Sequence, residues 1–143
     1  MSTEANKAIL RRWVEEFWNQ KNPALIDEIL SPTYILHDPS GPVEGREGFR
    51  QFSAGFQTAI PDLHVTVEAM VAEGDKVVWR YLLRGTHQGD MFGIPATGKP
   101  VALRGIIISR FAGGMWAEDW QNNDLQVMLQ QIGALPVPQQ SEH

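Results

Sequence analysis

The last third of the chain, residues 101–133, constrains the fold more than any other stretch. It runs VALRGIIISRF, AGGM, WAEDWQ and NNDLQVMLQQIG, which predicts a long antiparallel hairpin followed by a closing helix. Side chains alternate between the two faces of a strand. Alternate positions of the first strand carry no charge and are expected to face the interior: Val101, Leu103, Gly105, Ile107, Ser109 and Phe111.

The second strand of this hairpin is expected to supply the polar lining of an interior pocket. Uninterrupted alternation puts these side chains on its inner face: Met115, Ala117, Asp119 and Gln121. Trp116, Glu118 and Trp120 then share the outer face. Because burial raises the pKa of a carboxyl group, Asp119 is the candidate general acid or base. The alternative role for Asp119 is an ion pair with an arginine: Arg80, Arg104 or Arg110.

The rest of the chain predicts helices first and strands afterwards. Apolar residues at helical spacing predict helices over 3–18, 23–30 and 45–60, the second with Asn22 as its N-cap. Alternation predicts strands over 33–38, 62–71 and 76–87, whereas 39–45 is expected to be a loop and 85–100 a lid-like one. Helices followed by strands indicate an α+β fold, in which a curved antiparallel sheet and the N-terminal helices enclose a pocket.

Composition restricts the chain to one globular domain, residues 1–143, whose Pro-rich tail, 136–143, is expected to fray. The formal charge of −5 argues against a nucleic-acid partner. No apolar run approaches the ~20 residues of a membrane span, so no membrane association is expected. The absence of cysteine removes disulfides and thiolate metal sites, and it is compatible with the cytoplasmic location that we expect.

Other motifs indicate ligand contacts rather than a nucleotide or metal site. GIPATGK, residues 93–99, has the spacing of a phosphate-binding loop, but Pro100 occupies the place of its Ser or Thr, and a strand follows. No histidine pairs with a carboxylate at metal-ligand spacing, so no metal is expected. His37 and His87 are candidate hydrogen-bond donors to a ligand, with structural hydrogen bonds as the alternative.

Six motifs along the chain carry a family resemblance: HDP at 37–39, GREGF, PDLHVTVE, RGTHQG, GIPATGK and EDWQNND followed by LQQIG. Over about residues 5–135 the chain resembles the SnoaL-like polyketide cyclases, or ester cyclases, of the NTF2-like superfamily. The resemblance implies a cone-shaped α+β barrel, an assembly of two or more chains and no cofactor. It also implies ring closure by aldol condensation, with an aspartate as acid/base beside a histidine. Those two places are occupied here by Gln121 and Ile107, which cannot exchange a proton near neutral pH.

The sequence therefore predicts a cofactor-free enzyme that moves a proton next to the carbonyl group of a small apolar compound, rather than a cyclase of the family's polyketide substrate. Asp119 is the expected acid or base. Gln121, His37 and His87 are expected to hydrogen-bond the developing enolate oxygen. The candidate walls are Trp13, Phe17, Phe92 and Ile107, and Trp13 and Phe17 have core packing as their alternative.

The sequence is also compatible with two alternative functions, and it predicts an assembly of two chains. The first rival is a non-catalytic protein that binds a hydrophobic ligand in the same cavity. The second is epoxide-hydrolase or dehydratase-like chemistry, which requires Arg80 to point inward beside Asp119. A homodimer is expected because the outer face of the hairpin carries an apolar strip between arginines: Arg104, Ile106, Ile108 and Arg110.

Overall fold

The computed structural model describes residues 2–136, so the tail predicted to fray lies outside it except for Pro136. The chain begins with α1 (Thr3–Arg12), which continues without a break into the π-helical segment η1 (Trp13–Asn19). The other helices of the described chain are α2 (Leu25–Ile29), α3 (Gly45–Ala59) and α4 (Leu125–Gln131). None of these helices has the length and apolarity that a membrane crossing requires.

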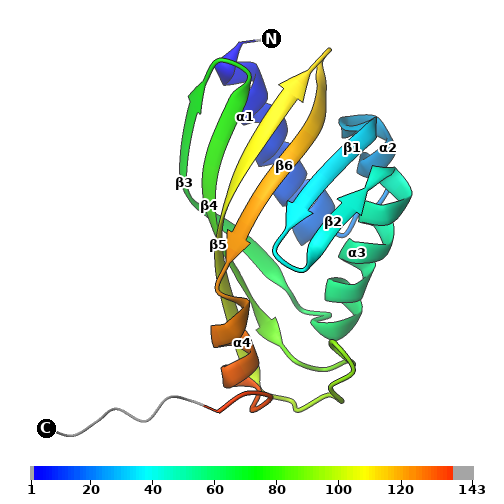
Figure 1. Cartoon of the computed structure of the whole chain (residues 1–143), viewed down its shortest axis with the longest axis vertical. Coiled ribbons are helices and arrows are strands. Elements are labelled where there is room, and N and C mark those ends of the chain that lie inside the picture. The colour runs from blue at the N-terminus through cyan, green and yellow to red at the C-terminus, as the bar shows by residue number, and fades with distance from the viewer. Residues whose placement is uncertain (1, 137–143) are drawn as a thin grey trace, which may run out of the picture.

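One sheet contains all six strands of the described chain: β1 (Leu30–Asp38), β2 (Gly41–Glu44), β3 (His64–Glu73), β4 (Lys76–Thr86), β5 (Pro100–Ala112) and β6 (Met115–Asn123). Their order is β2-β1-β6-β5-β4-β3, and only β1 and β6 pair in parallel. The sheet curves around the N-terminal helices (Figure 1). The predicted α+β class with a curved sheet is confirmed, but the barrel stays open because the edge strands β2 and β3 do not pair.

Two boundaries near the first strand differ from the sequence prediction. Leu30, expected at the end of the second helix, is the first residue of β1 and pairs with Trp116. An apolar residue fits a helix face and a buried strand equally well, so periodicity could not place it. Residues 41–44, expected to be a loop, form β2 and pair with the end of β1, from Ile35↔Glu44 to Asp38↔Gly41. Four residues that include Pro42 are too few to show alternation.

Strand β5 follows the predicted alternation, whereas β6 contains a bulge that breaks it. Every β5 side chain expected to face inward is buried. In β6, Glu118 pairs with Arg110 but Trp116 pairs with Phe111, so Ala117 is an extra residue. Trp116 and Asp119 consequently both face the interior, at 1% and 5% exposure. The prediction that Trp116 shares the outer face with Glu118 was wrong for this reason.

An aromatic cluster fills the core between the sheet and the first helices. The rings of Trp13 and Phe17 stack with centroids 4.1 Å apart, and both rings pack against Phe49 of α3. Trp13 also lies 5.5 Å from Trp116, centroid to centroid. Because Trp13 and Phe17 are buried among these rings, they belong to the core, which was the alternative offered by the sequence.

Candidate functional site

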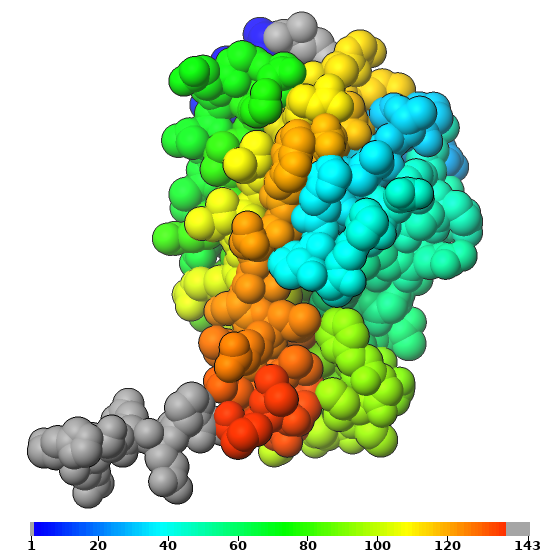
Figure 2. Space-filling model, viewed as in Figure 1, coloured from blue at the N-terminus to red at the C-terminus, as the bar shows by residue number. Residues whose placement is uncertain are grey.

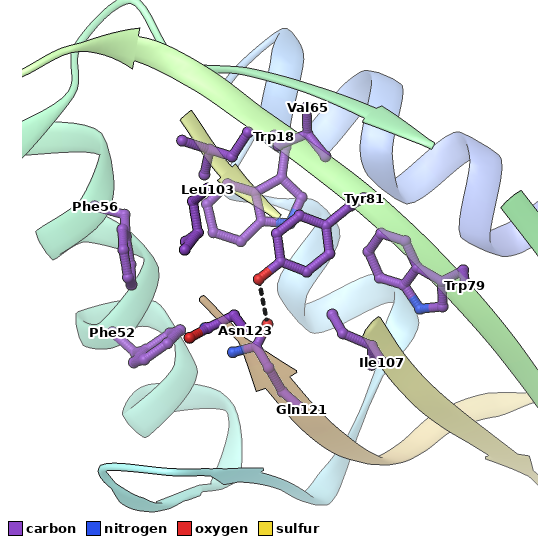
Figure 3. Close-up of a pocket in the computed structure, with 11 residues that line it drawn as sticks. Trp18, Phe52, Phe56, Val65, Trp79, Tyr81, Leu103, Ile107, Gln121 and Asn123 are labelled. Atoms are coloured by element: carbon purple, nitrogen blue, oxygen red, sulfur yellow. Dashed lines mark hydrogen bonds between the residues drawn. The ribbon is translucent and has the colours of Figure 1, made fainter. Parts of the chain in front are cut away.

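A largely apolar pocket lies between the inner face of the sheet and the helices (Figure 3). It has an empty volume of about 420 Å³, part of which is open to solvent. Five of the side chains that line it are aromatic: Trp18, Phe52, Phe56, Trp79 and Tyr81. The others are Val65, Leu83, Leu103, Ile107, Gln121 and Asn123. An apolar cavity with a few polar groups is the usual form of a small-molecule site.

The polar groups of the pocket are Tyr81, Gln121 and Asn123, and a hydrogen-bond chain orients the first two. The Tyr81 hydroxyl donates to Gln121 Oε1 at 2.9 Å, and Gln121 Nε2 donates to Asp38 Oδ1 at 2.8 Å. A carboxylate can only accept, so the amide nitrogen has to face Asp38 and the amide oxygen has to face Tyr81. Figure 3 shows the Gln121 oxygen pointing at Tyr81. The amide is therefore fixed in one orientation.

Tyr81 keeps its proton and owes its position to a glycine. Burial, together with the negative charges of Asp38 and Asp124, raises the pKa of the Tyr81 hydroxyl well above its ordinary value of 10.0. Gly105 pairs directly with Tyr81 across β4 and β5. A Cβ atom on Gly105 would lie 2.5 Å from the Tyr81 hydroxyl oxygen and 2.6 Å from ring atom Cζ. Only glycine leaves room for the phenol at this place.

Asp119 is buried behind the pocket wall and is not one of the lining residues. Its Oδ2 accepts from the Tyr34 hydroxyl at 2.5 Å, and its Oδ1 accepts from Trp116 Nε1 at 2.8 Å and from the Ser109 hydroxyl. Burial raises the pKa of Asp119 to about 6, although these three donors lower it. Asp119 has the expected burial and the expected raised pKa. It does not have the expected place in the pocket lining, where Trp79 and Ile107 form the wall instead.

The alternative ion pair of Asp119 with an arginine is absent from the described residues, where its partners are neutral donors. Ser109 links it to the wall, since the Ser109 hydroxyl accepts from Trp79 Nε1 at 3.0 Å. The alternation of residues 101–111 placed Ser109 on an inner face, but it could not predict this chain of hydrogen bonds, because the bulge in β6 decides which β6 side chains reach Ser109.

His37 and Arg80 lie on the outer face of the sheet, away from the pocket. His37 Nε2 lies 2.6 Å from Glu118 Oε2, and the His37 ring stacks on Trp120 with centroids 5.5 Å apart. This contact holds the pKa of Glu118 below its usual range. Arg80 is half exposed and forms an ion pair with Glu68 at 3.4 Å. Neither side chain lines the pocket. Epoxide or water-addition chemistry requires Arg80 to point inward beside Asp119, and Arg80 does not point there.

His87 and Phe92 belong to the segment 87–99, which connects β4 to β5. His87 is fully buried, and its Nδ1 lies 2.9 Å from the Thr97 hydroxyl, which is the structural role offered as the alternative. Phe92 is 58% exposed, and its ring contacts Phe56 edge-on with centroids 6.3 Å apart. Phe92 therefore lies at the rim of the pocket, next to a lining residue, and does not line it.

Of the predicted site residues, Ile107 and Gln121 line the pocket. They face each other as a direct cross-strand pair of β5 and β6. The sequence did not place Trp18, Phe52 and Phe56 in the pocket, because apolar residues at helical spacing fit a buried helix face equally well. In the structure Phe52 and Phe56 are only partly buried, and they extend from α3 into the pocket. No group of three or more His, Asp or Glu side chains within residues 2–136 forms a metal-binding cluster.

The family model described as SnoaL-like polyketide cyclase matches residues 8–132. The chain belongs to the SnoaL-like polyketide cyclase family. No curated protein matches it. Within this family, the positions where the resemblance puts the acid/base aspartate and its histidine are the pocket residues Gln121 and Ile107. Gln121 and Ile107 pair directly across β6 and β5, and their side chains are an amide and an alkyl chain.

Solved structures agree with this SnoaL-like assignment. TsrD from Streptomyces laurentii is 29% identical with a TM-score of 0.84, over 94% of this chain and 99% of TsrD. A SnoaL-like protein from Jannaschia sp. CCS1 is 28% identical with a TM-score of 0.84, over 94% of this chain and 95% of that protein. A ketosteroid isomerase-like protein from Catenulispora acidiphila DSM 44928 is 23% identical, with a TM-score of 0.73 over 87% of this chain and 92% of that protein. It supports the NTF2-like fold alone.

Proposed function

We propose that this SnoaL-like protein binds a flat, largely apolar carbonyl compound in the aromatic pocket and, without a cofactor, promotes proton transfer next to the carbonyl group. The observation that carries the proposal is the position of Tyr81, Gln121 and Asn123, whose polar groups gather in an otherwise apolar cavity (Figure 3). Aromatic walls favour a flat ligand, and the amides fix the end at which its oxygen lies.

The amide groups supply the stabilisation that enolate formation needs. One N–H of Gln121 is occupied by Asp38, which leaves its second N–H for the ligand, and the Asn123 amide offers further donors. Donors that are already oriented stabilise the negative charge that develops on a carbonyl oxygen, and they do so more strongly in an apolar cavity than in water. Tyr81 is committed to Gln121 and keeps its proton, so it orients this amide.

The pocket is tested with two probes, an aromatic alcohol and an aromatic ketone. Binding of 2-naphthol is followed by tryptophan fluorescence, because Trp18 and Trp79 line the cavity. Exchange of the α-protons of 2-tetralone in D₂O is followed by NMR. We expect 2-naphthol to bind and to inhibit this exchange competitively. Native protein that neither binds 2-naphthol nor accelerates exchange contradicts the proposal.

A second candidate function is binding without catalysis. It is favoured by a specific observation: no side chain of the pocket lining ionises near neutral pH, since the polar ones are two amides and a tyrosine whose pKa is raised. Binding of 2-naphthol, with 2-tetralone exchange at the rate of the buffer, would support this function. For the same reason we expect native protein to leave the polyketide esters of the family's aldol cyclases unchanged.

We also propose that the protein forms a homodimer through the outer face of β4, β5 and β6. In the views of Figure 1 and Figure 2, α4 lies over the lower end of this face, and no other helix of the described chain lies in front of it. It exposes Ile106 and Ile108, at 51% and 38%. Arg104 and Glu68 form an ion pair on the same face at 3.3 Å. A strip with apolar residues and both charges can pair with a second copy of itself.

A further inference from the structure

We propose that Asp38 is the proton acceptor of this pocket. The inference rests on the proposed function and names the group that takes the proton. Asp38 is the last residue of β1, next to the turn that leads into β2, and it is half-buried. Among the described residues it is the only carboxylate that forms a hydrogen bond with a side chain of the pocket lining, through Gln121 Nε2 at 2.8 Å.

The remaining contacts of Asp38 hold the carboxylate in place and leave it able to accept a proton. Its Oδ2 accepts from the Ser40 N–H at 3.0 Å and from the Ser40 hydroxyl, and its Oδ1 accepts only from Gln121 within the described chain. A carboxylate has about four acceptor sites, so one remains, and Oδ1 is the oxygen that accepts from a pocket side chain. The same hydrogen bond that orients Gln121 therefore keeps Oδ1 next to an amide of the polar end of the cavity.

Asp119 is the competing carboxylate, and its surroundings favour a structural role. It also receives three donors, but it is 5% exposed and lies behind the wall formed by Trp79 and Ile107. A general base has to come within hydrogen-bond reach of the carbon-bound proton, directly or through one water. A ligand in the pocket would have to displace Trp79 from Ser109 before it could reach Asp119. Asp38 is not a lining residue either, but its carboxylate contacts a lining side chain, Gln121, directly.

The proposed step is an enolisation that consumes no other reactant. A C–H bond next to the ligand carbonyl breaks, and the proton passes to Asp38 Oδ1, directly or through one water. The electron pair forms the C=C bond of the enolate, and the carbonyl oxygen takes the negative charge beside the Gln121 and Asn123 amides. Return of a proton from the Asp38 carboxylic acid to carbon restores the ketone. In D₂O the Asp38 carboxylic acid exchanges this proton for a solvent deuteron before it returns one to carbon, and the deuterium on carbon makes the step visible.

The test compares α-proton exchange of 2-tetralone in D₂O by native protein and by Asp38→Asn, Asp119→Asn and Glu44→Gln. The asparagine side chain keeps an oxygen that can accept from Gln121, so Asp38→Asn removes the base and conserves the contact. Glu44 is an exposed carboxylate on the same hairpin and is the matched control. We expect Asp38→Asn to lower exchange at least about 100-fold. We expect 2-naphthol affinity to stay within about threefold of native in both hairpin variants.

The possible outcomes separate this inference from the proposed function. Exchange by Asp38→Asn at the native rate overturns the role of Asp38 and leaves proton transfer in the pocket standing. Loss of exchange in Asp119→Asn, with Asp38→Asn still active, assigns the base to Asp119 instead. Native protein that binds 2-naphthol but exchanges 2-tetralone at the rate of the buffer overturns both proposals. Loss of exchange in Asp38→Asn alone, with 2-naphthol still bound, is the result that supports Asp38.

Discussion

Asp119 is a buried carboxylate that no cation neutralises within the described chain, and its charge should be visible in the pH dependence of stability. Burial raises the pKa of Asp119 from 3.8 to about 6 in the folded protein. The folded state therefore holds this proton more tightly than the unfolded state does. Between pH 3.8 and about 6 the Asp119 contribution to the free energy of unfolding falls as pH rises, and above that range it is constant.

The expected size of this contribution is roughly 3 kcal/mol, because each pH unit of difference corresponds to about 1.4 kcal/mol. We predict that Asp119→Asn removes it, so that the stability difference between native protein and variant changes between pH 4 and 7. Urea unfolding at a series of pH values measures this difference. Other carboxylates, such as Glu118, whose pKa is lowered, contribute the opposite trend to both proteins and cancel. Parallel pH curves for native protein and Asp119→Asn would contradict the prediction.

Gly105 gives a second prediction at the scale of one residue. In Gly105→Ala the new methyl group would lie 2.5–2.7 Å from the Tyr81 hydroxyl and ring atoms, so the phenol has to move and its hydrogen bond to Gln121 is disturbed. We expect a loss of about 1–3 kcal/mol in the free energy of unfolding, together with weaker 2-naphthol binding. Gly55→Ala in α3 is the control, since nothing lies within 4 Å of its added Cβ. It should stabilise the helix by about 0.5–1 kcal/mol. Equal effects of the two substitutions would contradict the packing described for Tyr81.

At the scale of elements, the sequence predicts β5 completely and β6 only in part. Alternation assigns every inner residue of β5 because its pairing with β4 has no interruption. In β6 the extra Ala117 shifts the alternation, and neither its identity nor its neighbours signal a bulge. Gln121 and Ile107 lie beyond the bulge, and alternation alone places them in the pocket. The sequence could not predict the enclosure of Asp119 or the contact between Asp38 and Gln121, because both depend on how β1 lies beside β6.

The segment 87–99, which carries Phe92 at the rim of the aromatic pocket, gives a prediction about ligand binding. Its Phe92 has a backbone φ of 51°, which is rare for a residue with a side chain, and presents its ring to Phe56. If this segment covers a bound ligand, Phe92→Ala should weaken 2-naphthol binding by roughly tenfold, about 1.4 kcal/mol. Stability should change by less than about 0.5 kcal/mol because the ring is exposed. Fluorescence titration and urea unfolding measure the two effects, and an unchanged affinity would exclude Phe92 from the site.

For the whole molecule, the assembly state depends on the outer face of the sheet. We expect native protein to sediment as a dimer at micromolar concentration and Ile106→Asp to sediment as a monomer, because a charge replaces an apolar side chain at the interface. Val127→Asp is the matched control, since Val127 is 43% exposed and belongs to α4, outside the three strands of the proposed interface. A native monomer, or an equal effect of both substitutions, would contradict the proposed interface.

The central claim for the whole molecule is that a carbonyl ligand enters the aromatic pocket and places its oxygen at the Gln121 and Asn123 amides. The most direct measurement is a titration of ¹⁵N-labelled protein with 2-tetralone, followed through the side-chain amide signals. Asn122 is the internal reference, because it lies between these two residues in β6 but is exposed on the outer face. We predict that the Gln121 and Asn123 amide signals shift together and saturate, while the Asn122 signal stays in place. A shift of Asn122 alone, or none of the three, would contradict the account.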